Sequence, residues 1–310
     1  MIYSKLTSLA LAFLLGLQLA IAQPHGRRHN RREDQPRTVN VGNHLVPRAG
    51  KAGIVYTPYN DDGTCKSTGV VASDIASMNS LGFGMVRIYG VDCNQVSNVL
   101  AAVKPFGMKV FLGIFDMGQC ESQLAQLIQF VAGDWSSVYA VSIGNEQVNS
   151  GAMSVAAMVS KVNTSRAGLR AAGFSGPVVT VDTWVAIIAN PALCECSDFV
   201  AANCHPFFDG NVLPAAAGQF MSNSIAKLQS ACGGKQVMIT ETGWPHQGNP
   251  IGQCVPGLQQ QHDALASIHS VLGPNAFYFT RTDDLWKKDN PATANAEKYW
   301  GIKDFSTVTS

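Results

Sequence analysis

Short apolar runs alternate with helical stripes along the chain from about residue 53 onward. Eight of the runs are nearly continuous in Val, Ile, Phe and Tyr, which is typical of parallel strands that are covered on both faces. The pattern therefore predicts eight buried strands, at residues 53–59, 85–90, 109–115, 138–146, 178–183, 198–208, 236–245 and 275–284.

Between these runs, apolar residues recur at the spacing of one helix face, most clearly over 96–103, 124–131, 155–162 and 265–272. Glycines follow the helical stretches, as is common at helix ends, at Gly107, Gly133, Gly173, Gly233 and Gly273. About eight strand–helix units in roughly 250 residues are typical of the α/β class and of a single (β/α)8 TIM barrel. A doubly wound open sheet is the alternative, but it normally has fewer strands and a glycine-rich phosphate loop, which we do not find after the first strand.

The first 50 residues lack this alternation. Residues 1–22 combine Lys5 with an apolar stretch that ends in Ala20-Ile21-Ala22, which indicates a cleaved signal peptide. A membrane anchor is the alternative, but the stretch is short for a span. Residues 23–50 are basic and contain the pair Arg31-Arg32, so we interpret them as a disordered pro-segment. We expect a secreted chain without stable membrane insertion, whose barrel covers residues 51–310.

The composition and the net charge of the chain restrict the classes of partner that we expect. Hydrophobic residues make up 46% and charged residues 14% of the chain, and the net charge is +1. A large core is therefore expected, and nothing suggests a nucleic-acid partner. We also expect a monomer.

The chain contains eight cysteines, and an even number in an exported protein favours disulfides, although the spacing fixes no pairing. A zinc site is poorly supported, because Cys194 and Cys196 are separated by one residue and the other cysteines are scattered. One N-glycosylation sequon occurs, at Asn163-Thr164-Ser165.

Polar residues at the carboxyl ends of the predicted strands are the candidates for chemistry, because barrel active sites lie at that face. Two glutamates end otherwise apolar strands: Glu146 on the fourth strand and Glu241 on the seventh. Aromatic residues fall at the same rim, namely Tyr56, Tyr89, Trp184, Phe208, Trp244 and Trp286. Paired carboxylates among aromatic side chains suit a sugar polymer, whose rings stack on aromatic planes.

Three stretches carry a resemblance to a known family: "SIGNE" (142–146), "MITETGWP" (238–245) and the late "DDLWKKDN…AEKYWGI" (283–302). In this order they resemble glycoside hydrolase family 17, from about Gly53 to Phe305. Within that family the chain is most similar to the fungal cell-wall branch of β-1,3-glucanases and glucanosyltransferases. The resemblance implies a cell-wall enzyme whose partner is β-glucan polysaccharide, with no cofactor and no metal.

The resemblance also implies roles for individual residues. Glu146 matches the general acid/base and Glu241 the nucleophile of a retaining reaction, which calls for carboxyl groups about 5–5.5 Å apart. Asn145 matches the residue that binds the sugar 2-hydroxyl, and Arg87 is expected to donate to Glu241. The charge of Glu241 and partial burial are expected to raise the pKa of Glu146.

The remaining predicted contacts belong to substrate binding. Tyr56 and Tyr89 are expected to line the cavity, Trp244 and Trp286 to act as stacking platforms, and His205 and Phe208 to line the cleft. His205 lacks the second and third ligands that a metal site requires. On the last strand the family pattern Phe-Asp-Glu-x-Trp-Lys is replaced by Thr282 to Lys287, with Asp284 in place of Glu, so the contacts of that subsite are in doubt.

Other functions stay open. The two glutamates can be structural acids in a non-catalytic wall protein that only holds glucan. The same chemistry can act on β-1,6-glucan or a mannan. A secreted elicitor recognised by a host receptor is neither supported nor excluded by the residues.

Overall fold

The computed structural model describes Leu45 and residues 50–309, and its strands form one closed barrel. Each strand pairs in parallel with the next one along the chain, and β8 pairs with β1. This confirms the predicted (β/α)8 TIM barrel. The strands are β1 (Gly53–Val55), β2 (Met85–Arg87), β3 (Lys109–Ile114), β4 (Val138–Asn145), β5 (Val178–Thr183), β6 (Val200–Asn203), β7 (Val237–Thr242) and β8 (Ala276–Tyr278).

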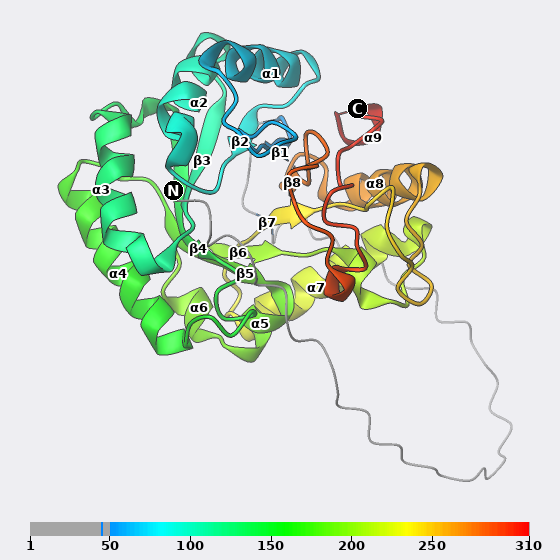
Figure 1. Cartoon of the computed structure of the whole chain (residues 1–310). Coiled ribbons are helices and arrows are strands. Elements are labelled where there is room, and N and C mark those ends of the chain that lie inside the picture. The colour runs from blue at the N-terminus through cyan, green and yellow to red at the C-terminus, as the bar shows by residue number, and fades with distance from the viewer. Residues whose placement is uncertain (1–44, 46–49, 310) are drawn as a thin grey trace, which may run out of the picture.

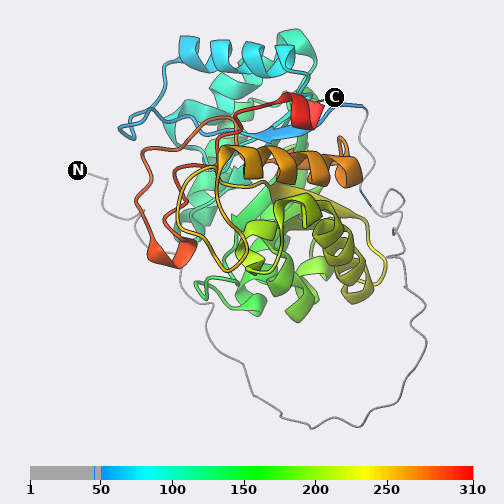
Figure 2. The same ribbon diagram turned by 90° about the vertical axis from the view of Figure 1, so that its right-hand side faces the viewer.

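Helices surround the barrel, with α1 to α4 along one side and α5 to α8 along the other (Figures 1 and 2). They are α1 (Thr68–Ser80), α2 (Gln95–Val103), α3 (Cys120–Val131), α4 (Val155–Ala171), α5 (Trp184–Ala189), α6 (Ala192–Glu195), α7 (Ala217–Ala231), α8 (Leu258–Leu272) and α9 (Ser306–Thr309). Short 3₁₀ turns are η2 (Asp92–Asn94), η3 (Lys104–Phe106), η4 (Met117–Gln119), η5 (Trp135–Ser137), η6 (Pro206–Asp209), η7 (Pro214–Ala216) and η8 (Pro291–Thr293).

Aromatic side chains from distant strands meet inside the barrel. The ring of Phe111 on β3 lies 5.6 Å from that of Phe277 on β8 and 6.3 Å from that of Phe199. Burying such a ring contributes about 1.5–3 kcal/mol to stability. The guanidinium of Arg87 lies 5.8 Å from the Phe111 ring, so the apolar filling of the barrel borders the polar site directly.

Several strands are shorter than the apolar runs predicted. The runs 53–59, 198–208, 236–245 and 275–284 continue beyond the last paired residue of their strands. The reason is that apolar residues past the ladder are buried by packing on one another at the barrel mouth, as the rings of Phe207 and Trp244 do at 5.3 Å. Hydrophobicity therefore marks burial here and overestimates strand length.

The glycines predicted at helix ends are confirmed, and each has a backbone conformation that ends a helix. Gly107, Gly133, Gly173, Gly233 and Gly273 all have φ between 50° and 87°. A residue with a side chain is strained in this left-handed region, whereas glycine is not.

One described residue lies inside the predicted pro-segment. Leu45, inside the predicted pro-segment 23–50, is only 2% exposed and forms a parallel bridge with Val237 at the start of β7. This residue packs against the barrel because its side chain covers the apolar start of a strand. The predicted signal peptide 1–22 and most of the pro-segment lie outside the described residues. Among those described, no helix has the length and apolarity needed to cross a bilayer.

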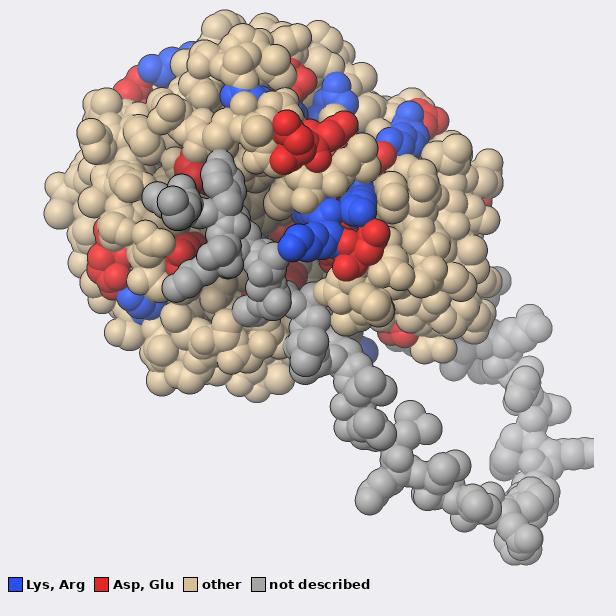
Figure 3. Space-filling view, in the orientation of Figure 1, with Lys and Arg blue, Asp and Glu red and all other residues tan. Residues whose placement is uncertain are grey.

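Two disulfides form, Cys65–Cys93 and Cys194–Cys232. The remaining cysteines are buried and unpaired, at Cys120, Cys196, Cys204 and Cys254. The expectation of disulfides is thus confirmed for half of the cysteines. Charged side chains are sparse on the face seen in Figure 3, and basic groups lie beside acidic ones rather than in a patch of one sign.

Candidate active site

Local irregularities in the pairing of strands β4 to β8 shape the carboxyl-terminal mouth of the barrel. The register shifts between Ser142 and Asn145 where β4 meets β5, between Ala202 and Asn203 where β6 meets β7, and between Ile239 and Thr242 where β7 meets β8. A bulge turns the following side chain to a new direction, and bulges commonly occur beside active sites. Each shift here falls next to a polar residue of the site described below.

Glu241, on β7, is 6% exposed and has three donors around its carboxylate. Arg87 Nη1 lies 2.5 Å and the Tyr89 hydroxyl 2.7 Å from Oε1, while His205 Nε2 lies 3.2 Å from Oε2. Burial alone raises the pKa of this carboxyl. The Arg87 charge and the hydrogen bonds from His205 and Tyr89 outweigh burial and lower the pKa to about 2. Glu241 is therefore held ionised.

Glu146, at the end of β4, has one side-chain partner among the described residues, because Asn203 Nδ2 donates to its Oε1 at 2.8 Å. Burial and the charge of Glu241 raise its pKa to about 8, against the hydrogen bond from Asn203, which lowers it. The backbone of Glu146 has a φ of 54°, unusual for a residue with a side chain. Hydrogen bonds to Val181 and from Ser150 hold this backbone on both sides.

Asn145 connects the two carboxyl environments. Its Oδ1 accepts from Arg87 Nη2 at 2.8 Å and from Asn203 Nδ2 at 3.1 Å. Both donors also contact a glutamate, Arg87 contacting Glu241 and Asn203 contacting Glu146. In the part of the chain that the structure describes, the Asn145 side-chain nitrogen makes no hydrogen bond. A hydroxyl group that enters the site can therefore accept from this nitrogen.

Two carboxyl groups in opposite protonation states therefore lie in one polar network. One is ionised and desolvated, as a nucleophile requires, and the other is protonated at neutral pH, as a general acid requires. Asymmetry of this kind is typical of acid/base sites in enzymes. Among the described residues, no cluster of His, Cys, Asp and Glu is arranged to hold a metal ion.

Other predicted residues lie around this centre. Phe208 is 41% exposed and packs against both His205 and Trp300. Trp286 is partly exposed, its ring lies 4.8 Å from that of Tyr59, and its indole N–H donates to Asp284 at 3.2 Å. Asp284 itself is 2% exposed, so it is a support beneath Trp286 rather than a surface group.

Two predicted residues do not face the site, and both need correction. Tyr56 is fully buried, and its hydroxyl donates to Asp74 on α1 at 2.8 Å. Trp244 is fully buried as well, and its indole N–H donates to the Val255 carbonyl at 2.9 Å. The rim position of both residues was inferred correctly, but the side chains pack outward or into loops, a direction that the sequence does not specify.

Two polar residues of the site were not predicted from the sequence. Asn203 stands within the apolar run 198–208, where a single amide among Val and Ala is the only signal. Lys287 lies 3.1 Å from Asp284 and above the rings of Phe279 and Trp286. The family pattern contained this lysine, but nothing in the sequence showed that it turns inward.

Comparison with known proteins gives the family. The model of the BtgE/BtgC glycoside hydrolase domain matches residues 53–301. The chain belongs to this family. The chain is 47% identical over 260 residues to the cell surface mannoprotein MP65 of Candida albicans. It is also 44% identical over 257 residues to the probable family 17 glucosidase SCW10 of Saccharomyces cerevisiae.

The alignments cover 83% and 82% of this chain, but 68% of MP65 and 65% of SCW10. A glycoside hydrolase family 17 β-1,3-glucanosyltransferase from Rhizomucor miehei has a similar structure, with a TM-score of 0.70 and 22% identity. That likeness covers 84% of this chain and 95% of the other, and it concerns the fold. The expected resemblance to family 17 is confirmed.

Proposed function

We propose that this chain is a secreted, retaining enzyme that cleaves internal β-1,3 linkages of β-glucan in the fungal cell wall. The intermediate is then either hydrolysed or transferred to another glucan, which remodels the wall. The single observation that carries the proposal is the pairing of Glu241, held ionised by Arg87, with Glu146, whose pKa is raised to about 8.

In the first step, a Glu241 carboxylate oxygen attacks the anomeric carbon and forms a glycosyl ester. The bond from that carbon to the glycosidic oxygen breaks, and its electron pair stays on the oxygen. The proton of Glu146 neutralises this leaving oxygen. The Asn145 side-chain nitrogen is placed to donate to the sugar 2-hydroxyl, a contact that strengthens in the transition state.

In the second step, Glu146 acts as a base. Esterified Glu241 carries no charge, so one cause of the raised pKa of Glu146 disappears. Glu146, which has given its proton to the leaving oxygen, therefore stays ionised. Glu146 then takes a proton from water or from a sugar hydroxyl, whose oxygen attacks the anomeric carbon and releases Glu241. Water gives hydrolysis, and a glucan hydroxyl gives transfer.

The relatives support the choice of glucan. SCW10 is named as a probable family 17 glucosidase, and the Rhizomucor miehei protein is a β-1,3-glucanosyltransferase. The partly exposed rings of Phe208 and Trp286 provide surfaces on which neutral sugar rings can stack. The name of MP65, a cell surface mannoprotein, supports a location outside the cell.

Incubation with a reduced β-1,3-glucan oligosaccharide, followed by mass analysis, tests the proposal. Shorter products alone indicate hydrolysis, and products longer than the donor indicate transfer. An unchanged oligosaccharide that nevertheless binds would contradict catalysis and favour a glucan-binding wall protein. The same assay with β-1,6-glucan decides the linkage.

Replacing Glu241 by Gln removes the nucleophile while keeping the size of the side chain. We expect kcat to fall by at least about 10³-fold with the fold intact. The measurement is oligosaccharide turnover, with circular dichroism as the check on folding. Glu121→Gln, which alters an exposed carboxylate on α3, is the matched control and should retain full activity. Substantial turnover by the Glu241 variant would show that the assignment is wrong.

A further inference from the structure

A buried carboxylate near the end of β5, that of Asp182, contacts the loop that follows Glu146. The residue is 1% exposed. Its Oδ2 accepts from the backbone N–H of Val148 at 3.0 Å, and its Oδ1 accepts from that of Asn149 at 3.2 Å. Oδ1 also accepts from the N–H of Thr183 at 2.8 Å. These bonds offset the cost of burying a carboxylate, because both of its oxygens have donors.

The two N–H groups of the loop lie in a tight turn that begins at Glu146. The N–H and the hydroxyl of Ser150 both donate to the Glu146 carbonyl, at 3.1 and 2.7 Å. The N–H groups at the start of such a turn have no partner within it. Asp182 supplies the acceptors for Val148 and Asn149. The buried carboxylate therefore fixes the backbone that directly follows Glu146.

Strand β5 contacts the backbone of Glu146 on its other side as well. The Glu146 N–H donates to the Val181 carbonyl at 2.9 Å, and the Thr183 hydroxyl donates to Asn149 Oδ1 at 2.9 Å. The φ of Glu146, 54°, is unfavourable for a residue with a side chain and persists only where the surroundings hold it. We therefore expect the Glu146 carboxyl to lose its position when the contacts from β5 are weakened.

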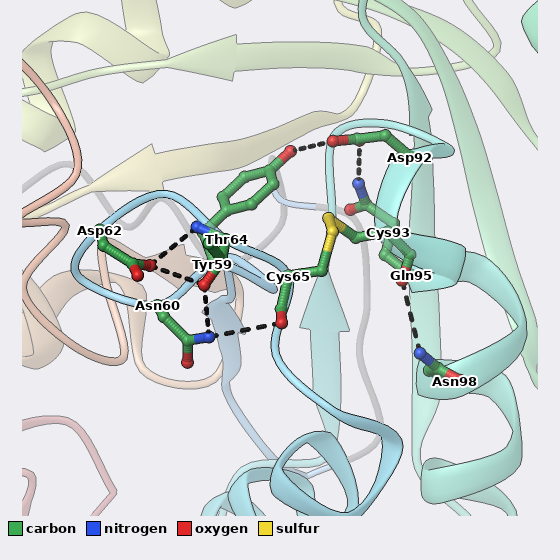
Figure 4. Close-up of a disulfide and its surroundings, with 9 residues drawn as sticks. All are labelled: Tyr59, Asn60, Asp62, Thr64, Cys65, Asp92, Cys93, Gln95 and Asn98. Carbon is green, nitrogen blue, oxygen red and sulfur yellow. Dashed lines mark hydrogen bonds between the residues drawn. A yellow bond between two sulfur atoms is a disulfide. The ribbon is translucent and has the colours of Figure 1, made fainter. Parts of the chain in front are cut away.

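The loop after β4 is held without a covalent cross-link, because residues 147–154 contain no cysteine. Elsewhere at the mouth, the Cys65–Cys93 disulfide joins the loop after β1 to the loop after β2 (Figure 4). The position of the turn after Glu146 thus depends on polar contacts, and two of these end on Asp182.

Asp182 also places a negative charge near Glu146. Burial raises the pKa of Asp182, but the hydrogen bonds from Thr183, Val148 and Asn149 oppose this and favour the ionised form. Within the described part of the chain, no basic side chain forms an ion pair with this carboxylate. Its charge is therefore not neutralised locally.

The charge of Asp182 acts on Glu146 together with two others. Burial and the charges of Glu241, Asp182 and Glu297 raise the pKa of Glu146, against the hydrogen bond from Asn203. The charge of Glu241 is lost when this residue is esterified, whereas that of Asp182 persists through both steps of the proposed reaction. Asp182 therefore keeps Glu146 a stronger base in the second step.

We propose that Asp182 is a positioning residue for the general acid/base, and that it acts through the backbone of Val148 and Asn149 to hold Glu146 where it exchanges a proton with the glycosidic oxygen. This inference rests on the proposed β-glucan activity and deepens it. The contacts of Asp182 are to the backbone after Glu146, so its role is separate from those of the two glutamates that react.

The variant Asp182→Asn tests the proposal, because it keeps the size of the side chain, removes the charge and turns an NH₂ group toward a backbone donor. We expect kcat on an aryl β-glucoside to fall about ten-fold or more while KM changes little. The alkaline fall in kcat/KM should move to lower pH, by up to about one pH unit, because loss of a negative charge lowers the pKa of Glu146. An unchanged kcat, or an alkaline fall that stays at the same pH, would overturn the proposal.

The variant Asp198→Asn is the matched control. Oδ2 of Asp198 accepts from the N–H of Val178 at 2.7 Å, so this carboxylate holds the opposite end of β5, away from the mouth. Its replacement should lower stability but keep kcat and the pH of the alkaline fall. If the two variants lose kcat equally, β5 acts as a whole and Asp182 has no specific role in placing Glu146.

Two further variants separate the charge from the geometry. Asp182→Glu keeps the charge but moves the carboxylate by one methylene group, so kcat should fall while the alkaline fall stays near pH about 8. Asn149→Ala is milder and removes only the acceptor of the Thr183 hydroxyl. It should lower kcat about three-fold without moving the alkaline fall. This variant keeps the proposal testable if the Asp182 variants do not fold, since an unchanged kcat would overturn positioning through this loop.

Failure of this inference can be told apart from failure of the proposed function. If the unaltered protein cleaves glucan and Asp182→Asn does so equally well with the same pH profile, the activity stands and the positioning role is overturned. If no substrate is cleaved, the proposed function fails, and carboxyl ¹³C NMR then measures the pKa of Glu146, identified by the signal that Glu146→Gln removes. A lower pKa in Asp182→Asn supports the coupling of Asp182 to Glu146, and an equal pKa overturns it.

Discussion

Two glutamates at one barrel mouth acquire opposite properties from their immediate neighbours. Glu241 receives a guanidinium, a phenol and an imidazole, whereas Glu146 receives a single amide. Both lie in a poorly solvated region, so burial pushes both pKa values upward. The number and charge of the donors then decide which glutamate ionises. Since the proposed mechanism requires ionised Glu241 and protonated Glu146, activity should fall below pH about 2 and above pH about 8.

The variant Asn203→Ala tests whether the loss of activity at alkaline pH comes from ionisation of Glu146. The amide of Asn203 donates to Glu146 and lowers its pKa, so its loss should raise the pKa further and move the alkaline limb upward. The shift is expected to be up to about one pH unit. The measurement is the pH dependence of kcat/KM with an aryl β-glucoside. The acid limb should stay in place, because the Asn203 side chain, which bonds Asn145, Glu146 and Thr240, is not among the groups that hold the Glu241 carboxylate. If the alkaline fall in kcat/KM stays at the same pH or moves to lower pH, the role of Glu146 is contradicted.

At the scale of secondary-structure elements, the end of β4 sets the direction of the Glu146 side chain. Gly144 has a φ of 77° and Glu146 a φ of 54°, and the register shift between β4 and β5 falls between Ser142 and Asn145. These irregularities present Asn145 and Glu146 in different directions from adjacent positions. A regular strand would do so only by sending one of the two side chains to the outer face of the barrel.

Gly144→Ala should damage both stability and catalysis. The added methyl group would lie 3.1 Å from Gln147 and 3.2 Å from Met158, at a backbone angle that strains any side chain. We expect the free energy of unfolding to fall by about 1–2 kcal/mol. Displacement of Glu146 should lower kcat about ten-fold or more. Urea denaturation and turnover of an aryl glucoside measure the two effects.

Gly133→Ala is the matched control for that change. Gly133 has a φ of 80°, and no atom lies within 4 Å of an added methyl group. This variant should lose stability through backbone strain and keep kcat, because it follows α3, away from the mouth. Equal losses of kcat in both variants would show that Gly144 has no specific role in aiming Glu146.

For the whole molecule, the raised pKa of Glu146 has a consequence for stability. Between its ordinary value of 4.5 and about 8, Glu146 is protonated in the folded chain and ionised in the unfolded chain. The folded state binds more protons in this window, so stability falls as pH rises through it. Keeping Glu146 protonated in the folded chain therefore costs stability at neutral pH.

Glu146→Gln should remove this cost. The melting temperature of the variant relative to the unaltered protein should rise between pH 4.5 and about 8 and stay level below pH 4.5. Each kcal/mol regained corresponds to roughly 2–4 °C. Calorimetric scans across the pH range provide the measurement. Glu121→Gln serves as a control, because a hydrogen bond from Lys161 lowers the pKa of that exposed carboxyl, so no gain is expected. A melting-temperature difference that does not depend on pH would contradict the pKa assigned to Glu146.

Much of the site was predictable because it depends on strand ends. Continuous apolar runs require burial on both faces, and only a parallel barrel or sheet provides this for eight runs. Glu146 and Glu241 were identifiable as acids at the limits of such runs. Tyr56 and Trp244 stand at equally suitable positions but turn away, because a residue's place on a strand does not fix where its side chain packs once the ladder ends.

The sequence by itself determined the barrel, the helix stops and the identity of the two carboxylates, because each depends on local periodicity or on a motif. Only the tertiary structure decided how the carboxylates differ. Arg87 comes from β2, and Asn203 and His205 come from the end of β6. Closure of the barrel brings them to Glu146 and Glu241. The loops after the first and last strands also become neighbours only in three dimensions, because β8 pairs with β1.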